Sequence, residues 1–163
     1  MIQVSLDTSF LISFADPTRP HHETAVNYFK YCVNSGIAMF VSTVVAGEFH
    51  LGQPFSDLPL QNLRIQPYNL PHALRAAELL KFYNSQNSSP RTESRRVIIN
   101  DIKILAQAAE DKVAIVLSED EGTLAKLASR ARAVATDIPR VILLSEGFAS
   151  GRLTSANQDE FPL

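Results

Sequence analysis

The apolar run VAIVL at Val113–Leu117, followed by SEDE at 118–121, decides the fold class of this chain. A continuous apolar run of this length, ended by polar residues, is typical of a strand buried on both faces of a parallel sheet. A second strand is expected at Ile2–Leu6, directly before Asp7. The remaining strand-like segments are Ile37–Val41, Leu63–Tyr68 with Pro67 limiting its pairing, and Val141–Leu144. The sequence therefore predicts a sheet made largely of buried strands.

Helical segments alternate with these strands. Apolar residues recur with the helical period, and small polar residues stand where helices would begin. The expected helices are Phe10–Ala15 capped by Thr8 or Ser9, His21–Asn34, a helix from Ser42 or Thr43 to Gly52, Pro71–Tyr83, Arg95–Glu110 and Thr123–Arg132, with a polar loop at Asn84–Ser94. This alternation predicts an α/β fold, a three-layer α/β/α sandwich around a mostly parallel, twisted sheet.

The composition fits one compact domain. The chain has 163 residues, 45% of them hydrophobic, which is enough for a substantial core. We expect a single domain over 1–149 and a polar C-terminal tail over 150–163. The single cysteine, Cys32, excludes an internal disulfide and a thiolate metal cage. The N-terminus does not resemble a signal peptide, and no apolar run reaches the roughly 18 residues of a membrane span. A cytoplasmic protein without membrane contact is expected.

The charge of the chain is close to neutral. A formal net charge of −2 argues mildly against a generic nucleic-acid binder, since such proteins are usually basic. Arg91, Arg95 and Arg96 nevertheless cluster just before an expected helix. They are candidates for contacts with a phosphate backbone, and such contacts position a nucleic acid without reading its sequence. The alternative is a solvated loop.

Four acidic residues stand in unusual places. Asp7 and Asp120 follow two predicted strands, and in open α/β sheets ligands bind beyond the carboxyl ends of the strands. If these strands are neighbours, both carboxylates face the same crevice. Glu48 and Asp101 lie within otherwise apolar helical segments. Each acid alone has a structural explanation, as a helix cap, a solvent-facing residue or a partner of Lys103. Together they suggest a shared site.

A metal ion would explain such a convergence. Buried carboxylates cost several kcal/mol each unless something compensates their charge. Mg²⁺ and Mn²⁺ prefer carboxylate oxygens and water as ligands. A bound ion of this kind can activate water and neutralise charge on a transferring phosphoryl group.

The acids also stand in motifs that resemble those of the PIN-domain nucleases, especially the VapC-type toxins. The resemblance is carried by Leu6–Ile12 (LDTSFLI), Ser42–Phe49 (STVVAGEF), Asn100–Ala108 (NDIKILAQA) and Val116–Asp120 (VLSED), and it covers most of the chain. It implies a metal-dependent endoribonuclease that hydrolyses RNA phosphodiester bonds. It further implies a homodimer neutralised by an antitoxin protein. The residues that it assigns are Asp7, Glu48, Asp101 and Asp120 as catalytic ligands of Mg²⁺ or Mn²⁺, with Ser9, Asn100 and Ser118 in support.

The sequence departs from the family pattern after the fourth acid, where Gly122 and Thr123 stand in place of the usual aromatic residue. With acids on both sides of Asp120, either Glu119 or Glu121 is an alternative fourth ligand. Two other functions stay open. One is a catalytically inactive PIN-like module that binds RNA or protein. The other is an aspartate-based phosphotransfer protein. Haloacid-dehalogenase-like phosphatases need a second aspartate two residues after the first, and the serine at position 9 counts against this function.

Overall fold

The computed structural model of the chain describes residues 2–86 and 95–154. Five strands form one sheet in the order β3-β2-β1-β4-β5, and all four neighbouring pairs are parallel. The strands are β1 (Gln3–Leu6), β2 (Ala38–Ser42), β3 (Leu63–Gln66), β4 (Ile115–Ser118) and β5 (Arg140–Leu143). The predicted parallel α/β sheet is therefore confirmed, and β3 lies at its edge as expected.

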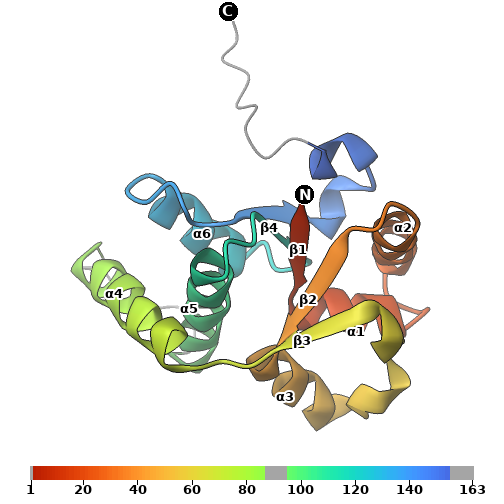
Figure 1. Cartoon of the computed structure of the whole chain (residues 1–163), viewed down its shortest axis with the longest axis horizontal. Helices are drawn as coiled ribbons and strands as arrows, with labels where there is room; N and C mark the ends of the chain where they lie inside the picture. Colours follow the sequence, from red (N-terminus) through yellow and green to blue (C-terminus); the bar gives the residue numbers. More distant parts are fainter. Residues whose placement is uncertain (1, 87–94, 155–163) are drawn as a thin grey trace, which may run out of the picture.

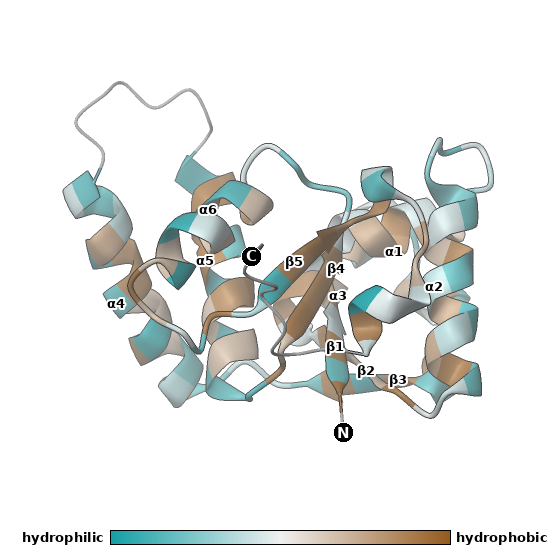
Figure 2. Ribbon diagram, turned by 90° about the horizontal axis from the view of Figure 1, so that it is seen from above, coloured by the Kyte–Doolittle hydropathy of each residue, from teal (hydrophilic) through white to brown (hydrophobic). Residues whose placement is uncertain are grey.

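Six α-helices surround the sheet. They are α1 (Thr8–Ala15), α2 (His22–Asn34), α3 (Thr43–Gly52), α4 (Leu70–Gln86), α5 (Arg95–Glu110) and α6 (Leu124–Arg132). The ribbon shows α4 and α5 on one side of the sheet and α1 and α2 on the other (Figures 1 and 2). None of the described helices is both long enough and apolar enough to cross a membrane.

Two details of the helices differ from the sequence prediction. Helix α1 is capped by Asp7, whose side chain accepts a hydrogen bond from the Phe10 backbone amide at 2.8 Å, so the expected cap by Thr8 or Ser9 is wrong. The short side chain of an aspartate after a strand is well suited to this role. Helix α4 continues to Gln86, so the start of the expected loop at Asn84 is helical. Residues 87–94, the rest of that loop, lie outside the described residues.

The core lies between the sheet and its two helical layers. Strand β4 is buried along its length and β1 from Val4 onward, and Val4, Leu6, Val116 and Leu117 have no exposed surface. A strand covered on both faces needs apolar side chains at successive positions, which explains the unbroken run that ends in β4. The last elements of the described residues are two short 3₁₀ helices, Leu144–Glu146 and Ser150–Leu153, and Leu153 is buried. Residues 155–163 of the predicted tail lie outside the described residues.

The strand order determines where two of the candidate acids, Asp7 and Asp120, lie on the sheet. From β1 the chain winds outward to β2 and β3, and then returns to the other side of β1 with β4 and β5. The reversal point lies between β1 and β4, whose Leu6 and Leu117 are in register. Crevices form at such points beyond the carboxyl ends of the strands. Asp7 and Asp120 both lie just beyond these carboxyl ends, Asp7 after β1 and Asp120 after β4.

Candidate metal centre

The four acids singled out in the sequence line one open cavity of about 300 Å³. Each comes from a different part of the fold: Asp7 follows β1, Glu48 lies on α3, Asp101 lies on α5, and Asp120 lies in the turn after β4. The complete lining consists of Asp7, Thr8, Ser9, Ile12, Glu48, Arg96, Val97, Asn100, Asp101, Ile104 and Asp120. The fold thus brings together acids that are up to 113 positions apart in the chain (Asp7 to Asp120).

Asp7 is almost fully buried and well supplied with donors. Its carboxylate accepts hydrogen bonds from the Phe10 amide at 2.8 Å, the Ser9 hydroxyl at 2.9 Å and the Ser118 hydroxyl at 2.6 Å. Burial raises the pKa of Asp7 to about 6, the three hydrogen bonds act against this rise, and the charge of Asp120 adds to it. The donors hold the carboxylate in a fixed orientation at the base of the cavity.

The hydroxyls of Ser9 and Ser118 join Asp7 to the turn after β4. The Ser9 oxygen accepts the Glu119 amide at 2.8 Å, and the Ser118 oxygen accepts the Asp120 amide at 2.8 Å. Each hydroxyl therefore donates a hydrogen bond to Asp7 and accepts one from a backbone amide of the turn. The position of Asp120 is in this way coupled to the position of Asp7, and both serines lie where a support for the acids would be needed.

Asp101 is in the opposite situation. Its side chain is buried, and its Oδ2 atom has no hydrogen-bond partner among the described residues. Burial raises the pKa of Asp101 to about 7; the nearby Thr123 side chain acts against this rise, and the charges of Asp120, Asp7 and Glu48 add to it. A buried carboxylate oxygen without a partner carries a large desolvation cost. Folding alone gives no reason for an acid at this position.

Glu48 is half-buried and is held by two other elements. Its Oε2 atom accepts a hydrogen bond from the Thr8 hydroxyl at 2.6 Å, and its Oε1 atom accepts one from the Asn100 side-chain amide. Helix α3 is thereby fastened to both α1 and α5 at the cavity. The contact of Thr8 was not expected from the sequence, because nothing in a linear motif shows that α1 packs against α3.

Asp120 is the acid of its turn that faces the cavity. Its two oxygens accept hydrogen bonds from Thr123, one from the amide at 2.9 Å and one from the hydroxyl at 2.6 Å. Glu121 is exposed and does not line the cavity. The sequence could not choose among the three adjacent acids, and it gave no sign of the contact with Thr123.

Glu119, the other alternative, is turned toward the fold. It accepts a hydrogen bond from the Ser13 hydroxyl at 2.5 Å, forms an ion pair with Arg19 at 3.0 Å and lies 3.9 Å from His21. Burial acts to raise the pKa of Glu119, but these partners outweigh it and lower the pKa below its usual value. Glu119 is therefore a structural acid whose negative charge is balanced by its partners.

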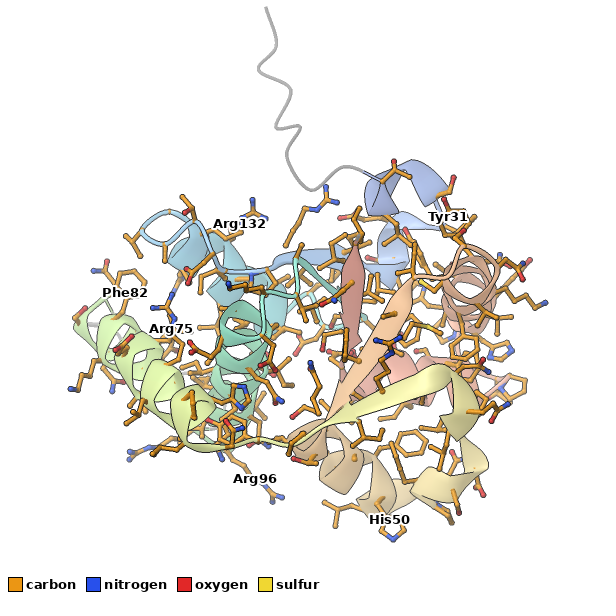
Figure 3. All side chains as sticks on the ribbon, in the orientation of Figure 1. Tyr31, His50, Arg75, Phe82, Arg96 and Arg132 are labelled. Carbon is orange, nitrogen blue, oxygen red and sulfur yellow. The ribbon has the colours of Figure 1, made fainter. Side chains whose placement is uncertain are left out.

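The four cavity acids, by contrast, form no ion pair with any Lys, Arg or His in the described ranges 2–86 and 95–154. Arg96 is exposed and lines the cavity; it is labelled in Figure 3. Arg95 is exposed but is not part of the lining, and Arg91 lies outside the described residues. Of the predicted arginine trio, the structure places one member at the site.

The acids line the walls of the cavity but do not converge on one point. Within the described part of the chain, no group of three or more His, Cys, Asp or Glu side chains is arranged to hold a metal ion. The donor set is nevertheless of one chemical kind, carboxylate oxygen, and the mutual repulsion of the acids contributes to the raised pKa of Asp101. Both are properties that a hard divalent cation would satisfy.

Structural comparison places this arrangement among known folds. FitAcB from Neisseria gonorrhoeae matches 88% of this chain and 99% of its own, with a TM-score of 0.60 and 18% identity. The chain has a PIN-like fold. VapBC2 from Rickettsia felis, bound to a DNA fragment from its promoter, covers 88% of this chain and 98% of its own, with a TM-score of 0.59 and 13% identity. VapC20 from Mycobacterium tuberculosis, a sarcin-ricin loop cleaving toxin, covers 74% and 92%, with a TM-score of 0.54 and 17% identity.

No family model matches the chain, and no curated protein matches it in sequence. The likeness to the PIN-like toxins therefore lies in the fold, and the expected resemblance to VapC-type proteins is confirmed at that level. What the chain does follows from its own cavity.

Proposed function

We propose that this chain is a metal-dependent ribonuclease that hydrolyses RNA phosphodiester bonds with Mg²⁺ or Mn²⁺ in the acid-lined cavity. One observation carries the proposal: Asp101 is a buried acid with an oxygen that has no partner among the described residues, in a cavity shared with three more carboxylates and no ion-paired cation. The PIN-like fold, shared with a toxin described as cleaving the sarcin-ricin loop, supports the choice of RNA as substrate.

The residues fit a hard divalent cation. Asp7 and Asp101 would hold the ion, and Glu48 and Asp120 would bind it directly or through water. The four carboxylates line one cavity, although no group of three or more among the described residues is already arranged to hold an ion. A bound ion would give a partner to the Asp101 oxygen that has no hydrogen bond among the described residues. When bound, such an ion supplies Lewis-acid polarisation of a phosphoryl oxygen and lowers the pKa of water.

The chain's own residues would then position the reaction. Ser9 and Ser118 keep Asp7 oriented, since both hydroxyls donate to it. Asn100 and Thr8 orient Glu48 in the same way. Arg96 lines the cavity and is exposed, so it can contact a phosphate of the RNA backbone on either side of the scissile bond.

The solved structures with the same fold suggest which partners to propose. FitAcB, VapBC2 from Rickettsia felis and VapBC from Salmonella typhimurium share the fold, and the last two are complexes bound to DNA. We propose that this chain likewise acts as the toxin of a toxin–antitoxin pair and forms a homodimer. Light scattering of the purified chain, alone and with the product of a neighbouring gene, tests both points.

Cleavage of RNA by an Asp7→Asn variant tests the enzymatic proposal. The substitution keeps the size of the side chain but removes its charge, so RNA cleavage in Mg²⁺ should be lost. Asp137→Asn is the matched control, because Asp137 is an exposed acid that pairs with Arg75 and does not line the cavity. Full cleavage by Asp7→Asn would overturn the proposal.

A PIN-like module that binds RNA without cutting it is the second candidate. The dispersed arrangement of the acids favours it, since no described group is ready to hold a metal. A Mn²⁺ titration separates the two candidates. Heat of Mn²⁺ binding that disappears in Asp101→Asn supports the nuclease, whereas RNA binding without any Mn²⁺ binding supports the module.

A further inference from the structure

Gln107 is a buried polar residue in an otherwise apolar part of α5. Only 2% of its surface is exposed. Its Oε1 atom accepts a hydrogen bond from the Ser42 hydroxyl at 2.5 Å, and its Nε2 atom donates to the carbonyls of Gln66 at 3.3 Å and Pro67 at 3.4 Å. A leucine at this position would need none of these partners. The amide therefore serves a purpose other than filling space.

The direction of these hydrogen bonds is determined by Ser42. Its oxygen caps α3 by accepting the Val44 amide at 3.1 Å, so its single proton is free to be donated to Gln107. The oxygen of the Gln107 amide must then face Ser42, and the nitrogen must face the two carbonyls at the end of β3. Gln107 thus joins the first residue of the α3 cap, the edge strand and α5.

A second hydrogen bond joins the same two helices at the cavity, from Asn100 on α5 to Glu48 on α3. The two ties run in reversed order: Ser42 comes before Glu48, whereas its partner Gln107 comes after Asn100. Six positions separate the first two residues and seven the second two. At a rise of 1.5 Å per residue these are roughly 9 Å and 10.5 Å, so the two ties form rungs of matched spacing between oppositely running helices.

We infer that Gln107 is a positioning residue: through Ser42 it fixes the register of α3 on α5 and so holds Glu48 beside Asp101. Without the rung at Gln107, the hydrogen bonds of Glu48 with Asn100 and Thr8 hold α3 at one end only, so α3 can pivot about them. Two rungs prevent both pivoting and sliding. Because Asp101 directly follows Asn100, the register decides whether the acids of α3 and α5 can meet at one metal ion. This role rests on the proposed function only in its last step.

The register is tested first without metal. In the wild-type protein, the Asn100 side-chain amide should give a shifted NMR signal with slow proton exchange, because it is bonded to Glu48. Gln107→Leu should return this signal toward that of a free amide. The matched control is His72→Leu, which removes a buried tie from α4 to Asp111, beyond the far end of α5. It should leave the Asn100 signal unchanged.

The consequence is tested by Mn²⁺ calorimetry on the same proteins. Loss of a residue that orients a metal ligand costs roughly 10- to 100-fold in metal affinity, and we expect this loss in Gln107→Leu but not in His72→Leu. Ser42→Gly breaks the same rung from the other side, and glycine is tolerated at a helix cap. It should show the same loss, and the double variant should lose no more than either single one.

An unchanged Asn100 signal in both Gln107→Leu and Ser42→Gly would overturn the inference, whatever the metal does. A changed signal with unchanged Mn²⁺ affinity would overturn the link from register to the metal. If the wild-type protein binds no Mn²⁺ while the Asn100 signal responds as expected, the proposed function fails and the register role of Gln107 stands.

Discussion

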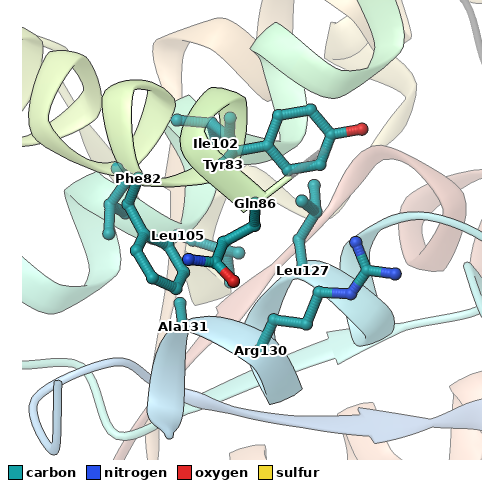
Figure 4. A pocket seen from close by; sticks show the side chains of 9 residues that line it. Phe82, Tyr83, Gln86, Ile102, Leu105, Leu127, Arg130 and Ala131 are labelled. Carbon is teal, nitrogen blue, oxygen red and sulfur yellow. The ribbon is translucent and has the colours of Figure 1, made fainter. Parts of the chain in front are cut away.

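Two hollows lie along α5, and they differ in what folding explains. The first is the acid-lined cavity, to which α5 contributes Asn100, Asp101 and Ile104. The second is a small pocket of about 20 Å³ between α4, α5 and α6, into which α5 turns Ile102 and Leu105 (Figure 4). Apolar residues make up most of the second lining, and burying them stabilises the fold. The cavity does the reverse, because its buried carboxylates form no ion pair with any cation of the described residues, although Arg96 lies in its lining.

Helix α5 therefore has one face that stabilises the fold, at the apolar pocket, and one face whose residues folding does not explain, at the acid-lined cavity. Substitutions in the apolar pocket should change stability and leave chemistry alone. Substitutions in the acid cavity should change chemistry and, where they remove charge, increase the stability of the metal-free protein. Variants of both hollows, and the pH dependence of the metal-free protein, test this separation.

Asp101→Asn should have the largest effect. We expect RNA cleavage to fall by more than the roughly 10- to 100-fold that the loss of a residue behind a metal ligand costs. The same variant should melt at a higher temperature than the wild type in EDTA at pH 8, because it no longer buries a charge. Cleavage assays and thermal melts on one preparation give both results. A variant that is less stable and equally active would remove the contrast between the two hollows.

Leu105→Ala should affect stability alone. Leu105 is 1% exposed, and truncating a buried leucine costs about 2–5 kcal/mol. Urea unfolding should show this loss. The rate of RNA cleavage per folded molecule, measured well below the melting temperature, should stay at the wild-type value. A large loss of cleavage in the folded protein would mean that the apolar pocket takes part in the function.

The metal-free protein should lose stability as the pH rises from about 4 to about 7. The pKa of Asp7 is raised to about 6 and that of Asp101 to about 7, from an ordinary value of 3.8. Between these values the folded state binds more protons than the unfolded state, so the free energy of unfolding falls with pH. For each acid the loss is on the order of a few kcal/mol, since one pKa unit corresponds to about 1.4 kcal/mol.

Melting temperatures in EDTA across this range measure the slope, and Mn²⁺ should flatten it. Asp101→Asn should also flatten it, because that variant has one acid fewer to titrate. A metal-free protein whose stability rises steadily from pH 4 to pH 7 would contradict the assignment of both acids as uncompensated.

Glu119→Gln should have the smallest effect. Its partner Arg19 is partly exposed, and such ion pairs contribute no more than about 1 kcal/mol. The glutamine can still accept the hydrogen bond from Ser13, and the backbone amide that supports Ser9 is unchanged. Cleavage should stay at the wild-type rate. A strong loss would identify Glu119, rather than its neighbour Asp120, as the acid that acts in the cavity.

Much of the fold is predictable from the sequence because strands β2 and β4 consist mainly of consecutive apolar residues. The run VAIVL and the first strand give the parallel sheet, and helix α5 has the predicted bounds, Arg95–Glu110. The strand order is not predictable in this way. Nothing local to Leu6 or Leu117 shows that they lie in register, yet this contact brings Asp7 and Asp120 to one edge.

The sequence predicts the four acids of the candidate site and, through the resemblance, Ser9, Asn100 and Ser118 beside them, but not the other residues that hold the acids. Position after a strand, or within an apolar helix, marks Asp7, Glu48, Asp101 and Asp120 as unusual. Their supports depend on contacts between elements, and so Thr8, Thr123 and Gln107 carry no signal in the linear sequence. Asp7 shows a further difficulty of prediction from sequence, because the same carboxylate caps α1 and lines the cavity.

Crystals of the wild-type chain soaked in Mn²⁺ would show whether the acid-lined cavity binds a divalent cation, because manganese scatters anomalously. We predict an anomalous peak within coordination distance of the Asp7 and Asp101 carboxylates, with the free oxygen of Asp101 turned toward it, and no such peak in Asp101→Asn. A wild-type crystal with no peak in the cavity, or with one only at surface carboxylates such as Asp137, would contradict the account.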